Sequence, residues 1–311
     1  MSTPWPALPV QQWETTRDTL HLWTQVVGKV RLALEPRVNH WWNVPLYVNS
    51  HGLTTSLMPH QGRGVEIEFD FTAHHLTIQT TDGATRSMSL EPRDVASFYS
   101  EFMSHLDAAG IAVQINPMPA EIPDAIPFPD DHLHAAYDEE AVHRFWQSLV
   151  SAHRVLSRFR ADYRGKASPV HFFWGGFDLA VTRFSGRVAP PHPGGVPHCP
   201  DWVMVEAYSD ELSSCGYWPS GANEGLFYSY AYPEPAGFRE HRVAPDDARY
   251  DADLGEFVLP YESVRTATDP DAYLLEFLSS TFDAASSLAH WERRPTPTDL
   301  HQPAQSSEDP S

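Results

Sequence analysis

An internal repeat is the feature of this 311-residue chain that most constrains its fold. The helical pattern around Trp23 returns around Trp146, and aligning the two tryptophans also places Arg31 on Arg154. In both segments apolar residues recur at helical spacing, which predicts an amphipathic helix with one buried stripe. The repeat predicts a duplicated unit. The alternative is a chance similarity between two amphipathic helices.

Short runs typical of strands follow each of these helices, and the dipeptide Asp82-Gly83 indicates a hairpin turn in the first unit. The expected strands of the first unit are 42–48, 52–58, 65–71, 76–81 and 85–90. Those of the second unit are 170–174, 178–184, 203–208, 226–232 and 255–259. A further helix closes each unit, around 97–103 and 272–278. We therefore expect an α+β fold of two related helix–antiparallel strands–helix units with a pseudo-twofold duplication.

Composition shifts predict where the units begin and end. The expected divisions are a first unit over 1–116, a Pro-rich linker over 117–137, a second unit over 138–292 and a disordered tail over 293–311. The second unit is longer because of two inserts, 186–202 and 218–253. Loops that one copy has and the other lacks are a common place for function to be added.

The charge balance excludes several classes of partner. With 41 Asp and Glu against 21 Lys and Arg, the net charge is −20, and such a surface repels nucleic acid. No run approaches the ~20 apolar residues of a membrane helix, so no membrane partner is expected. The N-terminus lacks the pattern of a secretory signal, and Cys199 and Cys215 are expected to be free, which favours a cytoplasmic protein. The sequence leaves the oligomeric state open.

Lysine is rare among the basic residues. Lys29 and Lys166 are the two lysines of the chain, and its other basic residues are arginines. The codon bias of a GC-rich genome is compatible with this ratio, so it is not taken as a sign of anion binding.

Six strings along the chain are similar to those of a known family. They are 5–9 (WPALP), 42–47 (WNVPLY), 171–180 (HFFWGGFDLA), 183–187 (RFSGR), 230–235 (YAYPEP) and 256–261 (EFVLPY). On these strings the chain resembles an uncharacterised bacterial family known only as a domain of unknown function, number 5996 of that series. The resemblance covers nearly the whole chain except the tail. It supports the unit boundaries and implies no activity.

A loop rich in possible ligands makes a divalent metal one hypothesis for a cofactor. Of the 17 histidines, His192 and His198 lie close in sequence to Asp210, and two imidazoles with a carboxylate suit a transition metal. However, the chain has no His-Glu-x-x-His and no Cys-x-x-Cys motif. The alternative is a set of solvated loop histidines.

The segment 171–184 is the second candidate. Treated as one alternating strand, it places Asp178 on the face of Trp174, and His171 and Arg183 on the opposite face. A carboxylate within an apolar strand needs a partner, and Arg183 or Arg187 is the expected one. The candidate catalytic residues of this reading are His171, Asp178, Arg183 and Glu211.

An aromatic run in 226–235 is the third candidate, because Tyr228, Tyr230 and Tyr232 alternate onto one face. They predict either a pocket wall or an ordinary half-buried sheet face. The candidate ligand-binding residues are Trp174, Arg187, Trp218, Tyr228 and Tyr230. The favoured function is a small-molecule-binding protein or enzyme with an aromatic-lined pocket in the second unit. The alternative is a non-catalytic scaffold or protein-interaction module.

Overall fold

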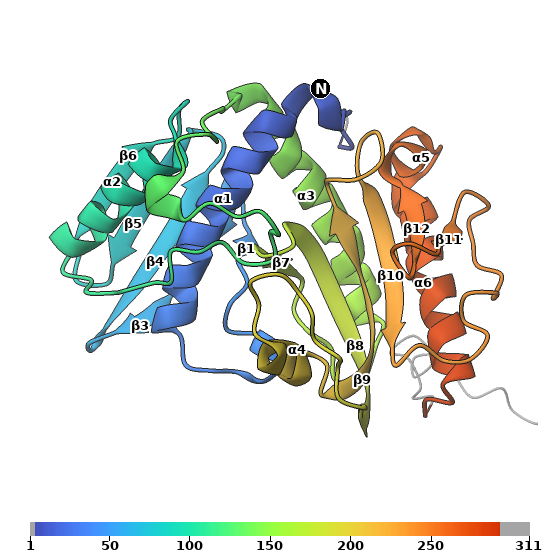
Figure 1. The fold of residues 1–311 in the computed structure, drawn as a ribbon. Helices are drawn as coiled ribbons and strands as arrows, with labels where there is room; N and C mark the ends of the chain where they lie inside the picture. The colour runs from blue at the N-terminus through green and yellow to red at the C-terminus, as the bar shows by residue number, and fades with distance from the viewer. Residues whose placement is uncertain (1–3, 293–311) are drawn as a thin grey trace, which may run out of the picture.

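The computed structural model describes residues 4–292, and its two sheets are antiparallel and flanked by helices (Figure 1). The predicted α+β class is therefore confirmed. The helices are α1 (Val10–Leu34), α2 (Val95–Ala108), α3 (Glu139–Ala161), α4 (Asp201–Ala207), α5 (Tyr261–Thr266) and α6 (Pro270–Leu288), with 3-10 turns η1 (Asn39–Trp41) and η2 (Phe128–Asp130). No helix within the described range is long and apolar enough to cross a membrane.

The first unit carries a sheet in the order β1-β2-β4-β5-β6, with β3 paired to β4. Along β4, Val65, Ile67 and Phe69 are buried, while the intervening residues face outward, as period-2 alternation requires. The strands are β1 (Tyr47–Val48), β2 (Gly52–Thr54), β3 (Met58–His60), β4 (Arg63–Asp70), β5 (His75–Thr80) and β6 (Thr85–Ser89).

The second unit carries a sheet in the order β11-β12-β10-β9-β8-β7. Helices α3 and α6 contact one face of it through β8, β9 and β10 (Figure 1). The strands are β7 (His171–Phe173), β8 (Asp178–Val188), β9 (Asp210–Trp218), β10 (Leu226–Tyr232), β11 (Arg249–Asp251) and β12 (Glu256–Pro260).

Helix α1 and a two-strand junction hold the units together. The segment 22–31 of α1 is buried on all sides, and the helix contacts α2, α3 and β3. At the sheet edges, Leu46 and Phe172 exchange backbone hydrogen bonds of 2.9 and 2.8 Å. Trp174 spans the same junction, since its Nε1 donates to Val44 O at 2.8 Å. The strand paths of the two sheets are similar but not identical, so the duplication stays a prediction.

Two expectations about local structure are wrong, and one strand was missed. Residues 203–208 belong mainly to helix α4, because Pro200 and Asp201 favour a helix start that outweighs the β-branched residues. The expected strands 170–174 and 178–184 are present as β7 and β8, but the reading of 171–184 as one alternating strand is wrong, because the two are separated by a turn at 174–177 in which Phe177 has φ of 57°. Strand β9 was not expected from the sequence.

The Pro-rich linker packs against the protein rather than spanning free space. It contains η2, whose Phe128 is fully buried, and Asp131 is nearly so. Backbone hydrogen bonds from Ala96 to Asp131 and from Val95 to His134 fasten it to the start of α2. The predicted disordered tail, 293–311, lies outside the described residues.

Candidate functional site

The face of the second sheet that points away from α3 and α6 gathers most of the predicted ligand-binding residues. Residues directly opposite one another in an antiparallel sheet point to the same side. Asp178 pairs with Phe173, Gly216 with both Ala180 and Tyr228, and Tyr230 with Ser214. We call this surface the open face; it consists of Phe173, Asp178, Ala180, Thr182, Ser214, Gly216, Trp218, Tyr228, Tyr230, Glu256 and Val258.

Asp178 is held on the open face by a tyrosine. Tyr228 Oη donates a 2.5 Å hydrogen bond to Asp178 Oδ2. The tyrosine ring reaches Asp178 by lying across Gly216, where a Cβ would come within 2.6 Å of Tyr228 Oη. Burial raises the pKa of Asp178 to about 6, although the Tyr228 hydrogen bond acts in the opposite direction. A carboxylate with this pKa can hold or release a proton near neutral pH.

Neither of the two arginines that were expected to pair with Asp178 does so, and that prediction is wrong. Arg183 lies on the helix-covered face, where it donates to Phe159 O and its guanidinium sits 3.4 Å from the centroid of the Phe159 ring. Arg187 forms an ion pair with Glu211 at 2.6 Å and donates to Ala289 O at 2.7 Å. The Arg187–Glu211 pair joins the strand end to the end of α6, so neither residue reaches the open face.

A second carboxylate comes from the linker. Glu121 has φ of 63°, and its backbone N–H donates to Pro197 O at 2.9 Å. Its side chain lies against the 174–177 turn so closely that a Cβ on Gly175 would overlap Glu121 Oε1. A Cβ on Gly176 would lie 2.9 Å from Asp178 Oδ1 and 3.8 Å from Glu121 Oε2, so the two carboxylates are neighbours. Glycines at this turn make that approach possible.

The environment of Glu121 favours its protonated form. Glu121 as a whole residue is exposed, but its carboxylate lies against the 174–177 turn, where loss of solvation raises its pKa to about 7 and the charge of Asp178 adds to this. Two neighbouring carboxylates cannot both ionise at their usual pKa because their charges repel. Among residues 4–292, the Glu121 carboxylate has no hydrogen-bond or ion-pair partner.

Glu256 and a tyrosine pair complete the site. Burial raises the pKa of Glu256 to about 7, with contributions from the charges of Asp178 and Asp251. Its carboxylate also has no hydrogen-bond or ion-pair partner within the described range. On the same face, Tyr230 Oη and Tyr208 Oη are 2.9 Å apart.

Tyr208 belongs to the segment 189–209, which we call the strap because it crosses the open face. His192 in the strap stacks on Tyr208 with ring centroids 4.6 Å apart and on Tyr232 at 5.4 Å. Tyr232 Oη donates to Pro190 O at 3.0 Å. Helix α4 of the strap contacts η1 of the first unit, and Figure 1 shows α4 beside the lower ends of β8 and β9. The strap thus links the open face to both units, and it includes most of the predicted insert 186–202.

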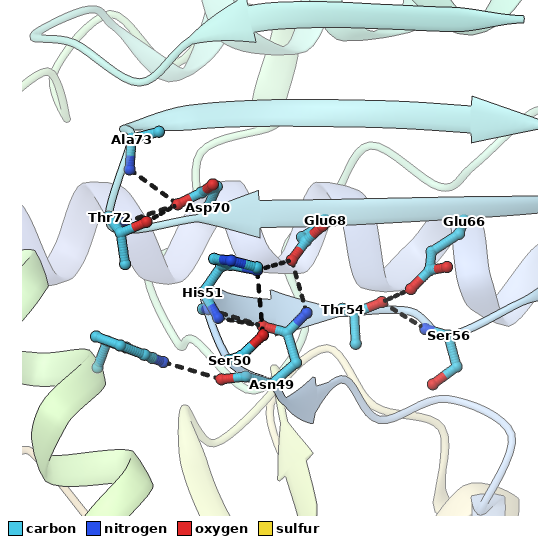
Figure 2. Close-up of polar contacts among 12 residues, drawn as sticks. Asn49, Ser50, His51, Thr54, Ser56, Glu66, Glu68, Asp70, Thr72 and Ala73 are labelled. Carbon is cyan, nitrogen blue, oxygen red and sulfur yellow. Dashed lines mark hydrogen bonds and ion pairs between the residues drawn. The ribbon is translucent and has the colours of Figure 1, made fainter.

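The carboxylates on the first sheet provide a comparison, because each of them has hydrogen-bond partners nearby. Figure 2 shows Glu66, Glu68 and Asp70 at alternate positions of β4, each bound by neighbouring side chains or backbone. Thr54 Oγ1 donates to Glu66 at 2.6 Å and Asn49 Nδ2 to Glu68 at 2.7 Å.

Asp70 differs from Asp178 in the sign of its pKa shift. Burial raises the pKa of Asp70, but hydrogen bonds from Thr72 and Ala73 outweigh this and leave it below its usual value. The first sheet therefore satisfies its acids locally, whereas Glu121 and Glu256 are left without partners.

His171 and Trp174 are buried core residues. The hairpin puts His171 on the same side of the sheet as Asp178, contrary to the single-strand expectation, because His171 pairs with Ala180. It is fully buried among aromatic rings, neither ring nitrogen has a hydrogen-bond partner among residues 4–292, and burial lowers its pKa to about 3. It is thus a neutral core histidine at the junction of the sheets.

The predicted metal ligands have separate partners. Asp210 pairs with Lys166 at 2.9 Å, His192 Nδ1 accepts from Gly194 N at 3.1 Å, and His198 Nε2 is 3.1 Å from Pro123 O. Within 4–292, no group of three or more His, Cys, Asp or Glu side chains is placed to hold a metal ion. We therefore do not carry the metal hypothesis further.

Sequence reasoning missed Glu121, Glu256 and Tyr208. Glu256 carried a usable signal, since it precedes the apolar run 257–259 in a strand and alternates with Val258. Tyr208 was missed because its segment was read as a strand. Glu121 sits in a linker with no periodicity, and only the folded chain brings it to the 174–177 turn.

The molecule is thus an α+β protein whose second sheet presents an aromatic and acidic face beneath a strap. A family model described as "Family of unknown function (DUF5996)" matches residues 5–297, and the chain belongs to that family. No curated protein and no solved structure matches the chain.

Proposed function

We propose that this protein binds a small organic molecule on the open face, either as an enzyme or as a binding protein. The observation that carries the proposal is the group of three neighbouring acids Asp178, Glu121 and Glu256, whose pKa values are raised to about 6, 7 and 7 and which have no cationic partner in the described part of the chain. Unpaired ionisable groups in a partly buried position reduce stability. Groups of this kind, with strongly shifted pKa values, cluster at functional sites.

The chemistry of the face defines the class of ligand. Tyr228, Tyr230 and Trp218 offer aromatic surface, and the acids offer hydrogen-bond acceptors and negative charge. The matching ligand carries a protonated amine or several hydroxyl groups on a compact apolar frame. If the protein is an enzyme, Asp178 and Glu121 are the proposed proton-transfer pair, because acids that titrate near neutral pH suit general acid–base catalysis.

A thermal-shift screen of amines and polyols tests the proposal. A ligand at a hundredfold excess over its dissociation constant should stabilise the folded protein by about 2.7 kcal/mol. The stabilisation should be lost in Asp178→Asn and kept in Glu68→Gln, which alters a paired acid on the first sheet. Ligand-induced shifts that are equal in all three proteins would contradict the assignment of the site.

One surface feature favours the scaffold alternative. On α4, Trp202 is 57% exposed and Val205 is 42% exposed, which is unusual for large apolar side chains. However, Trp202 already packs against Trp41, with tilted rings whose centroids are 5.3 Å apart, and Arg37 lies over both rings. The exposed surface is therefore partly used within the chain, and the small-molecule proposal has the stronger support.

The proposal also keeps the expected cytoplasmic location. Cys199 and Cys215 are both free, Cys215 being buried on β9. A reducing compartment would keep these thiols in the form observed.

A further inference from the structure

Lys29 on α1 carries a buried amine that the proposed site does not use. The residue is only 8% exposed, and its Nζ lies 5.7 Å from the centroid of the Trp174 ring. Within 4–292, the amine has no hydrogen-bond or ion-pair partner. Its Nζ is not sealed from solvent, so the amine keeps a small accessible surface.

The surroundings of Lys29 favour the neutral amine. Burial lowers the pKa of Lys29, and the nearby Cys199 thiol, which acts in the opposite direction, does not offset it. Cys199 lies in the strap and is half-buried, and it interacts electrostatically with both Lys29 and Glu121. Lys29 therefore faces the segments that flank the open face.

The presence of lysine rather than arginine at position 29 indicates that the primary amine is the group used there. The chain uses arginine for all but two of its 21 basic residues, so arginine is its default cation. Arginine serves as well or better for charge, stacking and anion binding, but only lysine supplies a nucleophilic primary amine. Codon bias explains why lysine is rare and does not explain why one of the two is buried and unpaired.

Lys166, the other lysine, serves as an internal comparison. Its Nζ donates to Asp210 at 2.9 Å and lies 2.6 Å from His40 Nε2. These contacts occupy the amine. The two lysines of the chain thus differ in whether a carboxylate pairs with the amine, since Lys166 contacts Asp210 and Lys29 has no ion-pair partner within 4–292.

We propose that Lys29 forms a Schiff base with a small aldehyde or ketone. The Lys29 nitrogen bonds to the carbonyl carbon, and the carbonyl oxygen takes up a proton to give a carbinolamine. The carbinolamine then loses water, which contains the carbonyl oxygen and the two protons of the neutral amine, and a carbon–nitrogen double bond remains. No oxidant or reductant takes part. Buried lysines are the usual source of this chemistry.

Reductive trapping with propanal and sodium cyanoborohydride tests the inference on the full-length protein at pH 7. Peptide mapping would follow propylation at Lys29, Lys166 and the N-terminal amine in the same sample. We expect Lys29 to react several-fold faster than Lys166, because the Lys166 amine is occupied by Asp210 and His40 whereas the Lys29 amine has no such partner within 4–292. In 6 M guanidinium chloride the two lysines should react at about the same rate, because the preference depends on the fold.

Three variants sharpen the test. Lys29→Arg should abolish the fast reaction, Lys166→Arg should leave it intact, and Cys199→Ser should leave it intact if the product is an imine rather than a thiol adduct. Circular dichroism checks that each variant is folded, and Lys29→Met replaces Lys29→Arg if the larger side chain disturbs α1. Labelling of Lys29 no faster than Lys166 in the folded wild type would overturn the inference, whatever the variants do. Because it needs no acid of the open face, its failure leaves the proposed function standing.

Discussion

Replacing Gly28 by alanine is expected to destabilise the protein by about 1–3 kcal/mol, the range for forcing atoms into a filled core. A Cβ at this position of α1 would overlap the Trp174 ring at Cγ, Cδ1 and Nε1. The ring cannot easily move, because it is 7% exposed and its Nε1 donates to Val44 O at 2.8 Å. In an unhindered helix the same substitution would stabilise by about 1 kcal/mol. The predicted sign is therefore opposite to that from helix propensity.

A double-mutant cycle isolates the cause. Trp174→Leu should destabilise by itself, but in that background Gly28→Ala should be neutral or stabilising, because the overlapping ring is gone. Urea denaturation of the four proteins measures the coupling. If Gly28→Ala costs the same free energy with and without the tryptophan, the close contact between α1 and the 174–177 turn is not what fixes the glycine.

Asp178→Asn is expected to raise the free energy of unfolding at pH 8 by about 1–2 kcal/mol. This is the free energy that corresponds to a two-unit pKa shift, reduced because the carboxylate is partly exposed to solvent. The pKa of Asp178 is raised to about 6 by burial, so the folded state favours the neutral acid. The contribution of Asp178 to the stability of the folded state is fully present below the pKa that this residue has in the unfolded chain. It is lost as the pH rises through about 6, the pKa in the folded protein. At pH 4 the substitution should therefore change stability little.

Asp70→Asn is the matched control, because its pKa shift has the opposite sign. The pKa of Asp70 lies below its usual value, so its contribution is present above the unfolded pKa and is lost as the pH falls. This substitution should destabilise the protein at pH 8. Chemical denaturation at pH 4, 6 and 8 compares the two variants. Loss of stability at pH 8 in both would mean that Asp178 is a paired structural acid.

Periodicity predicted those parts of the fold that depend on local sequence. The alternation in 226–232 gave strand β10 within its observed bounds, and the register of β10 on β9 then put Tyr228 and Tyr230 on one face as expected. The partner of Asp178 was wrong for a local reason. A turn at 174–177 reverses the chain, and this reversal moves His171 to the side of Asp178 and leaves Arg183 on the other.

The rest of the site depends on contacts between segments far apart in sequence. Glu121 and Asp178 are separated by an entire helix and meet only because the linker packs on the 174–177 turn. Lys29 and Cys199 come from different units and are neighbours through the packing of α1 and the strap. A single sequence carries the residue types for such a site but not the long-range pairing that assembles it.

The central claim is that Asp178 and Glu121 form a coupled group of acids at the open face with no cationic partner among residues 4–292. Carboxyl ¹³C NMR titration of these two residues tests it most directly. The account predicts that the pair titrates with apparent pKa values of about 6 and about 7. In Tyr228→Phe the pKa of Asp178 should rise further, because the hydrogen bond that lowers it is removed. Independent titrations near pH 4, the value for free side chains, would contradict the account.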